Sequence, residues 1–414
     1  MTASYMYMPS ITALNGHSAA FASISQNVSN LTTSGFKNSE TLFSDLVTNR
    51  NGSIFSQFSG IKPATRNLIE QQGAIISTNR SLDVAIDGTG FLVTNTAFDG
   101  SGSTLLTRAG SIDLRVVGAA GAEQAFLTDQ NGNFIQGWPS DGAGGFSIGN
   151  TLGSLQPIRV DAGAALSAAA ATTTATMSAN LPAGSATAAS FDLSVGVFDD
   201  LGNAHTVLFD FTKNAALDTW DVVATTPDGA VSAGSPFAMT FDAFGQIISP
   251  ANQTVGITWA NPATAAASSI AVDFSGMSQF GGAFTPQAIS SNGNTTGTLV
   301  EARVNAAGEI VGRFSNGLTQ GLAKLPLAVV RNQNGLTPQQ GTSFSLSTES
   351  GELRLLEADQ TSFGTFSPQA IENSAADLAT EFSKLIITQR AYSSAAQTIK
   401  VVDEMHQVAT RLKG

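Results

Sequence analysis

The chain has 414 residues, of which 42% are hydrophobic and 12% are charged, and its formal net charge is −12. This apolar content is enough for roughly two or three domains with their own cores, and it excludes disorder of the whole chain. The negative charge argues against nucleic acid as a partner, because binding to phosphate requires a surface of Lys and Arg. The sequence has no cysteine, which excludes a disulfide framework and any thiolate metal site.

Residues 1–36 contain no Asp, Glu, Lys or Arg, and Lys37 is the first charged residue. They lack the basic segment and the long apolar run of a usual signal peptide, so we expect no cleaved signal. The chain has no run of about 18 consecutive apolar residues, and we therefore expect no transmembrane span and no membrane insertion.

The first predicted element is a helix between Ile11 and Leu31, where apolar residues recur by sevens as in a coiled-coil seam. The seam residues are Leu14, Phe21, Ile24, Val28 and Leu31. The opposite face has small neutral side chains, which can pack against other chains without burying ions. Gly35 predicts a Schellman end of this helix, with Gly35 left-handed and Phe36 in contact with Leu31. The alternative is an ordinary surface helix that ends on glycine.

After a mixed connecting segment at 37–70, short alternating apolar stretches bounded by turn residues predict β-strands. These stretches lie at 82–94, 105–117, 131–138, 297–317, 322–330 and 343–356. Residues 161–190 are low in complexity and carry one charged residue, which indicates either a linker or the opening strand of a new domain. Because strand patterns resume after it, we expect a second β domain at about 150–284, inserted into the first.

The C-terminal end predicts a second long helix, with a capping box from Ser374 to Asp377 at its start. Its apolar seam consists of Leu378, Phe382, Leu385, Tyr392 and Ile399, at 3/4 or sevenfold spacing. Each terminal helix therefore has an apolar seam to bury, and we expect the two helices to pair with each other.

These elements together predict a mostly β protein with terminal α-helices and nested domains. Residues 1–36 and 372–414 are expected to form a helical inner domain of the coiled-coil type, and 37–70 a connecting segment. Residues 71–149 and 285–371 are expected to form a discontinuous inner β domain, with 150–284 as the inserted outer β domain.

The residue patterns predict no catalytic, metal or cofactor site, and hence no enzyme. The three histidines, His17, His205 and His406, are far apart in the sequence and have no metal-ligand spacing. The chain also lacks a G-x-S-x-G nucleophile elbow. The glycine pair at 87–90 and the calcium-like stretch at 129–133 are interpreted as tight turns, because each departs from its motif.

The two termini and one strand resemble the signatures of bacterial flagellar axial proteins of the rod and hook type. The matching stretches are NVSNLTTSGFKNS (27–39), LDVAIDGTGFL (82–92) and ITQRAYSSAAQTIKVVDEM (387–405). Within that family, DDLGNAHTV, MTFDAFGQIISP and EARVNAAGEIVGRFSNGLTQGLAKLPLAV are similar to stretches of the hook proteins. The resemblance spans nearly the whole chain, with the motifs in the same order.

The resemblance implies a structural subunit that polymerises into the hook, a hollow flexible universal joint that transmits torque from the basal-body rod to the filament. The implied partners are other copies of the chain, the rod and hook–filament junction proteins, the hook cap and the flagellar type III export apparatus. The implied location is extracellular, after export without a cleaved signal peptide. The residues of both seams, together with Gly35 and Phe36, are then expected to form the assembly interface.

Two alternatives remain. A distal rod protein shares the terminal motifs, but such proteins lack an inserted outer domain, so the strand-rich residues 150–284 favour the hook. A secreted β-rich adhesin or degradative enzyme with coiled-coil ends is a different class of protein. That interpretation requires the flagellar motifs at both termini to be coincidental.

Overall fold

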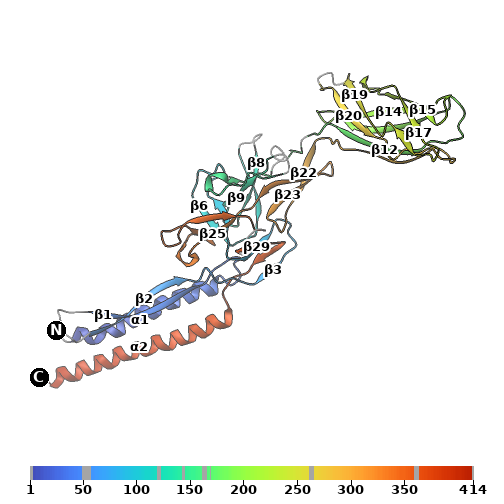
Figure 1. Ribbon diagram of the computed structural model, residues 1–414. Coiled ribbons are helices and arrows are strands. Elements are labelled where there is room, and N and C mark those ends of the chain that lie inside the picture. Colours follow the sequence, from blue (N-terminus) through green and yellow to red (C-terminus); the bar gives the residue numbers. More distant parts are fainter. Residues whose placement is uncertain are drawn as a thin grey trace. The chain divides into compact units, whose positions relative to one another are not determined.

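The computed structural model describes residues 3–48, 57–118, 123–141, 145–160, 166–167, 169–260, 265–358 and 363–412. The chain is mostly β, with one long helix near each end, α1 (Ala3–Ser29) and α2 (Leu378–Leu412) (Figure 1). This confirms the predicted fold class. The chain divides into two compact units. Unit 1 comprises Met1–Ala164, Glu301–Gly312 and Gln320–Gly414, and unit 2 comprises Ala165–Val300 and Arg313–Thr319.

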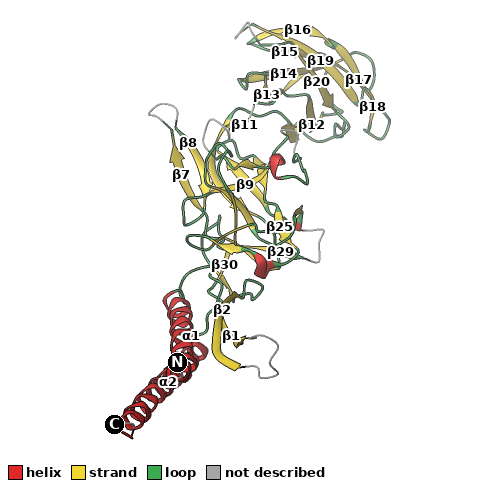
Figure 2. Ribbon diagram, turned by 90° about the vertical axis from the view of Figure 1, so that its left-hand side faces the viewer, coloured by secondary structure: helices red, strands yellow, loops and turns green. Residues whose placement is uncertain are grey.

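The segment expected to be a simple connection forms an antiparallel hairpin of β1 (Ser39–Thr48) and β2 (Gln57–Asn67). This hairpin packs against α1, and α1 also contacts α2. Figure 2 shows the β1–β2 pair beside the two helices. The helices are antiparallel, because Asn27 near the end of α1 contacts Glu381 near the start of α2. We call α1, α2 and the β1–β2 hairpin the helical arm of unit 1.

The end of α1 differs from the predicted Schellman motif. The helix stops at Ser29, and Gly35 is left-handed as expected, with φ +69°. However, the N–H of Gly35 donates to the carbonyl of Glu372 (2.8 Å), and the N–H of Phe36 donates to Thr33 (3.3 Å). The Schellman hydrogen bonds therefore do not form, because a carbonyl from the far end of the chain accepts the glycine N–H instead.

The start of α2 also differs from the prediction. The N-cap is Asp377, whose Oδ1 accepts the N–H of Thr380 (2.8 Å), and the helix begins at Leu378. Ser374 is not the cap, because the backbone around it is held in an extended link. In that link, the N–H of Ala375 donates to Phe36 (3.0 Å) and its carbonyl accepts the Asn38 amide (3.0 Å).

The rest of unit 1 is a body of short strands, which we call the β body. Its strands before unit 2 are β3 (Ile75–Ser77), β4 (Val84–Gly88), β5 (Leu92–Asn95), β6 (Thr104–Thr107), β7 (Asp113–Val117), β8 (Gln124–Thr128), β9 (Phe134–Pro139) and β10 (Gln156–Pro157). Those after it are β24 (Thr319–Lys324), β25 (Leu327–Val330), β26 (Thr337–Pro338), β27 (Ser343–Ser345), β28 (Leu353–Leu356), β29 (Gly364–Pro368) and β30 (Ala370–Glu372). Strands far apart in sequence pair here, as in β4 with β29 and β3 with β30.

The core of the β body includes Ile69, Phe91, Val93, Leu106 and Trp138, all buried. Two short 3₁₀ turns, Leu152–Ser154 and Gln333–Gly335, complete the connections between its strands. The hairpin expected at 297–317 is present as β22 (Gly297–Val304) and β23 (Glu309–Phe314). Both of its strands are divided between the two units.

Unit 2 contains two five-stranded sheets, with strand orders β16-β19-β20-β12-β21 and β13-β14-β15-β17-β18. Their strands are β12 (Thr174–Asn180), β13 (Ser190–Phe198), β14 (Ala204–Lys213), β15 (Thr219–Thr225), β16 (Gly229–Ala233), β17 (Phe237–Phe241), β18 (Ile247–Ser249), β19 (Asn252–Trp259), β20 (Ser268–Asp273) and β21 (Thr285–Ser291). A further short strand, β11 (Leu166–Ser167), pairs with β22. Buried residues alternate along β14 and β19, and one apolar cluster takes residues from both sheets, as in a β-sandwich.

The expected insertion at 150–284 does not coincide with unit 2. Gln156 still pairs with Gly137 of the β body, so unit 2 begins later than expected. At the other end, β21 pairs with β12 and extends the unit past residue 284. Both errors have a physical origin: β12 lies inside the Ala/Thr-rich stretch, and β21 is exposed along most of its length and lacks an alternating apolar pattern.

Four hairpin loops share one hydrogen-bond pattern. Each begins with Asp129, Asp199, Asp242 or Asn305, whose Oδ1 accepts the backbone N–H groups two and four residues later. The fourth residue is always glycine, with φ between +76° and +82°. The stretch at 129–133 is therefore the tight turn that its sequence predicted.

Candidate assembly region

The hairpin covers one face of α1 through small polar side chains. Ser23 Oγ lies 2.9 Å from Thr41 Oγ1 on β1, and Thr12 Oγ1 accepts the N–H of Ile61 on β2 (3.2 Å). The ring of His17 lies 5.4 Å from that of Phe43. The neutral face of α1 was expected to pack against other chains, but part of it is covered by the hairpin of the same chain.

Asn27 joins all three parts of the helical arm. Its Nδ2 donates to the carbonyl of Ser39 (2.9 Å) and to Glu381 Oε2 (3.1 Å), and its Oδ1 accepts the N–H of Ser39 (3.0 Å). Asn27 and Glu381 are each only 1% exposed. A buried polar pair of this kind fixes the register of two helices, because a shift along the axis leaves both groups without partners. Lys384 Nζ, 2.9 Å from Glu381 Oε1, balances the carboxylate charge.

The predicted seam residues have different environments. On α1, Ile24 is buried and Leu14, Phe21 and Val28 are half-buried, as is Leu31 just after the helix. On α2, Leu385 and Ile399 are half-buried, but Leu378, Phe382 and Tyr392 are 46%, 48% and 43% exposed. The most buried α2 positions are instead Glu381 and Thr388, seven residues apart. α2 is thus rotated so that the buried Asn27–Glu381 pair faces α1, while Leu378, Phe382 and Tyr392 are exposed in the single chain. Their role in an assembly interface stays a prediction.

The exposed surface of α2 is unusually apolar. Its exposed large side chains are Leu378, Phe382, Ile386, Ile387, Tyr392, Val401, Met405 and Val408. Residues 378, 382 and 386 are four apart, so they share one face of the helix, as do 401, 405 and 408. Contiguous apolar surface of this extent is typical of a site that other protein chains cover.

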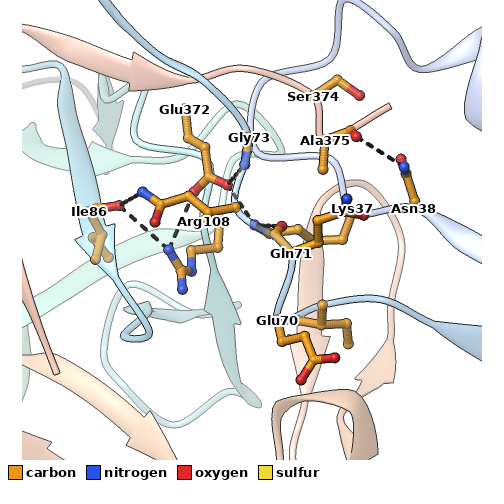
Figure 3. Close-up of polar contacts among 12 residues, drawn as sticks. Lys37, Asn38, Glu70, Gln71, Gly73, Ile86, Arg108, Glu372, Ser374 and Ala375 are labelled. Atoms are coloured by element: carbon orange, nitrogen blue, oxygen red, sulfur yellow. Dashed lines mark hydrogen bonds and ion pairs between the residues drawn. The ribbon is translucent and has the colours of Figure 1, made fainter. Parts of the chain in front are cut away.

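A buried ionic cluster joins the helical arm to the β body, and its centre is Glu372 at the end of β30 (Figure 3). Glu372 Oε1 accepts from Lys37 Nζ (2.5 Å) and from the N–H of Gly73 (2.8 Å). Its Oε2 lies 3.4 Å from Arg108 Nη1. Arg108 Nη2 also donates to the carbonyl of Gly88 (2.7 Å). The three charged side chains are at most 1% exposed.

The cluster holds two cations and one carboxylate, and its electrostatics follow from that count. Burial lowers the pKa of Lys37 below its ordinary value more than the attraction of Glu372 raises it, and Arg108 adds to the lowering. Burial likewise lowers the pKa of Arg108, against the opposing effect of Glu372. Glu372 is therefore the one carboxylate that compensates the charge of both buried cations, and backbone carbonyls accept their other hydrogen bonds.

Sequence reasoning missed Asn27, Glu381 and the Glu372 cluster as functional residues. One signal was present, since Lys37 is the first charge after 36 neutral residues and directly follows the left-handed Gly35. Among the described residues, no group of three or more His, Asp or Glu side chains is placed to hold a metal ion. None of the described helices is both long and apolar enough to cross a membrane.

Comparison with known proteins places these features among flagellar proteins. Residues 164–294 match the family described as flagellar basal body protein FlaE D2 domain, and residues 367–412 match flagellar basal body rod FlgEFG protein C-terminal. The chain is 30% identical to flagellar hook protein FlgE of Escherichia coli (strain K12), over 98% of this chain and 100% of that protein. It is 28% identical to the FlgE of Rhizobium meliloti (strain 1021), over 97% of each. The crystal structure of Helicobacter pylori flagellar hook protein FlgE2 covers 72% of this chain and 100% of its own, with TM-score 0.48 and 12% identity.

Proposed function

The chain belongs to the flagellar hook protein family, and from this premise we propose how it acts as a structural subunit of the bacterial flagellar hook. Copies of the chain polymerise into a hollow, flexible tube that transmits torque from the basal-body rod to the filament. The helical arm makes the contacts between copies, and the β body and unit 2 make up the rest of each subunit. The single observation that supports this most directly is the exposed apolar surface of α2.

The apolar surface of α2 is expected to be buried by contact with other protein chains. Phe382 and its neighbours on that face are about half exposed in the single chain, so each still has apolar area to bury. In a tube of packed helices, other copies bury this area. The exposed seam residues Leu378, Phe382 and Tyr392 then make contacts between copies. The predicted interface residues Ile24 and Gly35 are already buried and instead hold the subunit together.

We infer the further partners of the subunit from its flagellar motifs. At its ends the tube meets the rod and the hook–filament junction proteins, and during growth it meets the hook cap. The subunit reaches this extracellular place through the flagellar export apparatus without a cleaved signal. A rod-type subunit is the competing assignment, and unit 2, which falls in the matched FlaE D2 region, supports the hook.

The proposed assembly surface is tested by polymerisation of the purified full-length chain, followed by sedimentation and electron microscopy. Fully burying a Phe or Ile side chain contributes about 1.5–3 kcal/mol, so half-burial contributes roughly 1 kcal/mol. The double variant Phe382→Ser/Ile386→Ser should therefore raise the critical concentration at least about tenfold. Leu217→Ser is the matched control, because Leu217 is 90% exposed but lies in unit 2. Failure of the wild-type chain to form tubes of uniform width contradicts the function; an unchanged critical concentration in the double variant contradicts the surface.

A further inference from the structure

His205, the only histidine in unit 2, lies between two aspartates. Its Nε2 is 3.2 Å from Asp199 Oδ2, and its Nδ1 is 3.3 Å from Asp228 Oδ2. The imidazole and the Asp199 carboxylate are buried, whereas the Asp228 side chain is 43% exposed. The imidazole stacks on Trp259, with ring centroids 4.0 Å apart and planes inclined by 14°.

The number of ring protons decides whether both contacts are hydrogen bonds. A neutral imidazole has one N–H, so it donates to one carboxylate and turns a lone pair toward the other. An imidazolium has two N–H groups and donates to both. We propose that His205 is a proton-dependent latch of unit 2, closed when the imidazolium bridges Asp199 and Asp228 and open at Asp228 when the ring is neutral.

The surroundings of the latch are negatively charged. Unit 2 contains nine aspartates and no glutamate, against one lysine and one arginine, so its field is negative. The stacked face of Trp259 also attracts a charged imidazole. Burial raises the pKa of Asp199, but hydrogen bonds from Asn203, His205 and the N–H of Leu201 outweigh it and lower that pKa overall. The Asp199 carboxylate therefore stays ionised and ready to accept.

When the imidazole loses a proton, only one of its two contacts with aspartate remains a hydrogen bond. Asp199 is buried and also accepts from the Asn203 side chain (2.9 Å). A ring lone pair that faced this carboxylate would repel it, and neither group could turn to water. Asp228 is partly exposed, and its carboxylate can turn to solvent. The neutral ring therefore keeps its proton on Nε2 and releases Asp228 from Nδ1.

The latch joins elements of both sheets of unit 2. His205 is on β14, Asp199 opens the loop before it, and Asp228 lies in the turn between β15 and β16. β14 and β15 belong to one sheet, whereas β16 and β19, which carries Trp259, belong to the other. The backbone of the Asp228 turn is also tied to this end of β19, because its carbonyl accepts the N–H of Ala260 (2.8 Å).

The charged groups around His205 set the direction of the pH effect. Asp199 comes from the β13–β14 loop and Asp228 from the β15–β16 turn; Asp200, next in the loop, accepts the N–H of Ala266 (3.0 Å). With carboxylates as the partners, the closed latch stabilises unit 2 at low pH. This stabilisation is lost when the ring gives up its second proton, because a neutral imidazole donates to one carboxylate only.

The test uses the full-length chain at pH 5.5 and 8.5, on either side of the range in which histidine ordinarily titrates. With ¹⁵N-histidine labelling, both ring nitrogens of His205 should be protonated at pH 5.5, and Nδ1 should be unprotonated at pH 8.5. Deuterium exchange at the Ala260 amide, corrected for its intrinsic pH dependence, should be several-fold faster at pH 8.5. The unfolding temperature of unit 2 should be about 3 °C lower there.

Asp228→Asn separates the latch from a merely structural contact. The Asn amide can donate to a neutral Nδ1, so this variant should stay closed and protected at pH 8.5 and lose the pH dependence. His205→Gln should lose the pH dependence as well. Asp242→Asn changes the same kind of loop without a histidine and should keep the wild-type pH dependence. The proposal is overturned if Nδ1 has the same protonation at both pH values, or if His205→Gln keeps the wild-type pH dependence.

Discussion

Lys37 and Glu372 stand 335 positions apart in the sequence and form a buried ion pair of 2.5 Å. Lys37 follows the N-terminal helix, and Glu372 precedes the C-terminal one. Their contact therefore fixes both helices to the β body at a single point. Arg108, contributed by the β body itself, completes the link.

Glu372→Gln is expected to destabilise unit 1 by about 3–5 kcal/mol, because Lys37 and Arg108 then remain as two buried cations without a carboxylate. Lys37→Met should cost less, since Arg108 and Glu372 remain as a neutral pair. Urea unfolding curves measure both variants. The matched control is Glu40→Gln, which breaks the exposed pair with Arg66 (3.3 Å) and should cost at most about 1 kcal/mol. A larger loss for Lys37→Met than for Glu372→Gln contradicts this account of the cluster.

Gly35→Val should abolish motility while the protein is still made. A left-handed residue with a Cβ costs about 1–2 kcal/mol. In addition, the new Cβ would lie 2.5 Å from the backbone nitrogen of Ala109, so the chain must shift away from the β body. Gly184→Val is the control, because no atom lies within 4 Å of its Cβ position. Swimming assays and immunoblots check the result, and a motile Gly35→Val strain would refute it.

The N-cap of α2 should be sensitive to acid. Hydrogen bonds from the Thr380 side chain and backbone hold the pKa of Asp377 below its ordinary 3.8. A lowered folded-state pKa means that the carboxylate stabilises the helix above pH 3.8, and that this stabilisation is lost as the pH falls through the lowered value. Amide exchange at Thr380 in the polymer, measured down to low pH, should show the loss. Asp377→Asn, an uncharged cap, should not show it; equal acid sensitivity in both proteins argues against the carboxylate as the cause.

Polymerisation should order the helical arm. Helices rich in Ser, Asn and Thr are marginal alone in water, and α2 exposes much of its apolar surface in the single chain. We expect fast amide exchange in residues 3–35 and 378–412 of the monomer, and strong protection in the polymer in the same buffer. Equal protection in both states would show that the arm is already folded before assembly.

Unit 2 should be removable without unfolding the β body. Ala170 and Asn294 exchange two backbone hydrogen bonds, of 3.1 and 3.0 Å, so a short Gly/Ser linker can replace residues 171–293. The shortened chain keeps Trp138 and loses the other two tryptophans, so its tryptophan dichroism and tryptophan fluorescence report on the β body alone. Retained dichroism with a cooperative melt is the expected result. An aggregated or molten product would show that the two units do not fold separately.

The terminal helices, most strands and the left-handed Gly35 were predictable because each depends on a local pattern. A 3.6-residue or twofold period and a turn glycine are visible within a few neighbours of the sequence. The hairpin at 39–67 was missed, since its apolar residues do not alternate with polar ones: Leu42 and Phe43 are adjacent, and both are partly exposed. Its contacts with α1 also involve small polar side chains.

The polar contacts of the assembly region were not predictable, because their partners are distant in sequence. Nothing near Asn27 indicates that Glu381 will accept its hydrogen bond, and nothing near Lys37 indicates Glu372. The rotation of α2 has the same origin. α2 has more apolar residues than fit in a single seam, so the spacing of these residues does not define one contact face. The buried Asn27–Glu381 pair instead determines which face of α2 contacts α1.

The long sequence separation of these contacts determines when they can form during folding. Asn27, Gly35 and Lys37 each have a partner between residues 372 and 381, more than three hundred positions downstream. α1 can pack on its own hairpin at 39–67, but its contact with α2 and the contacts of the residues after it with Glu372 require the opposite end of the chain. For the proposed export through the flagellar apparatus, the contacts that join the two helices to the β body therefore form only after both ends of the chain have emerged.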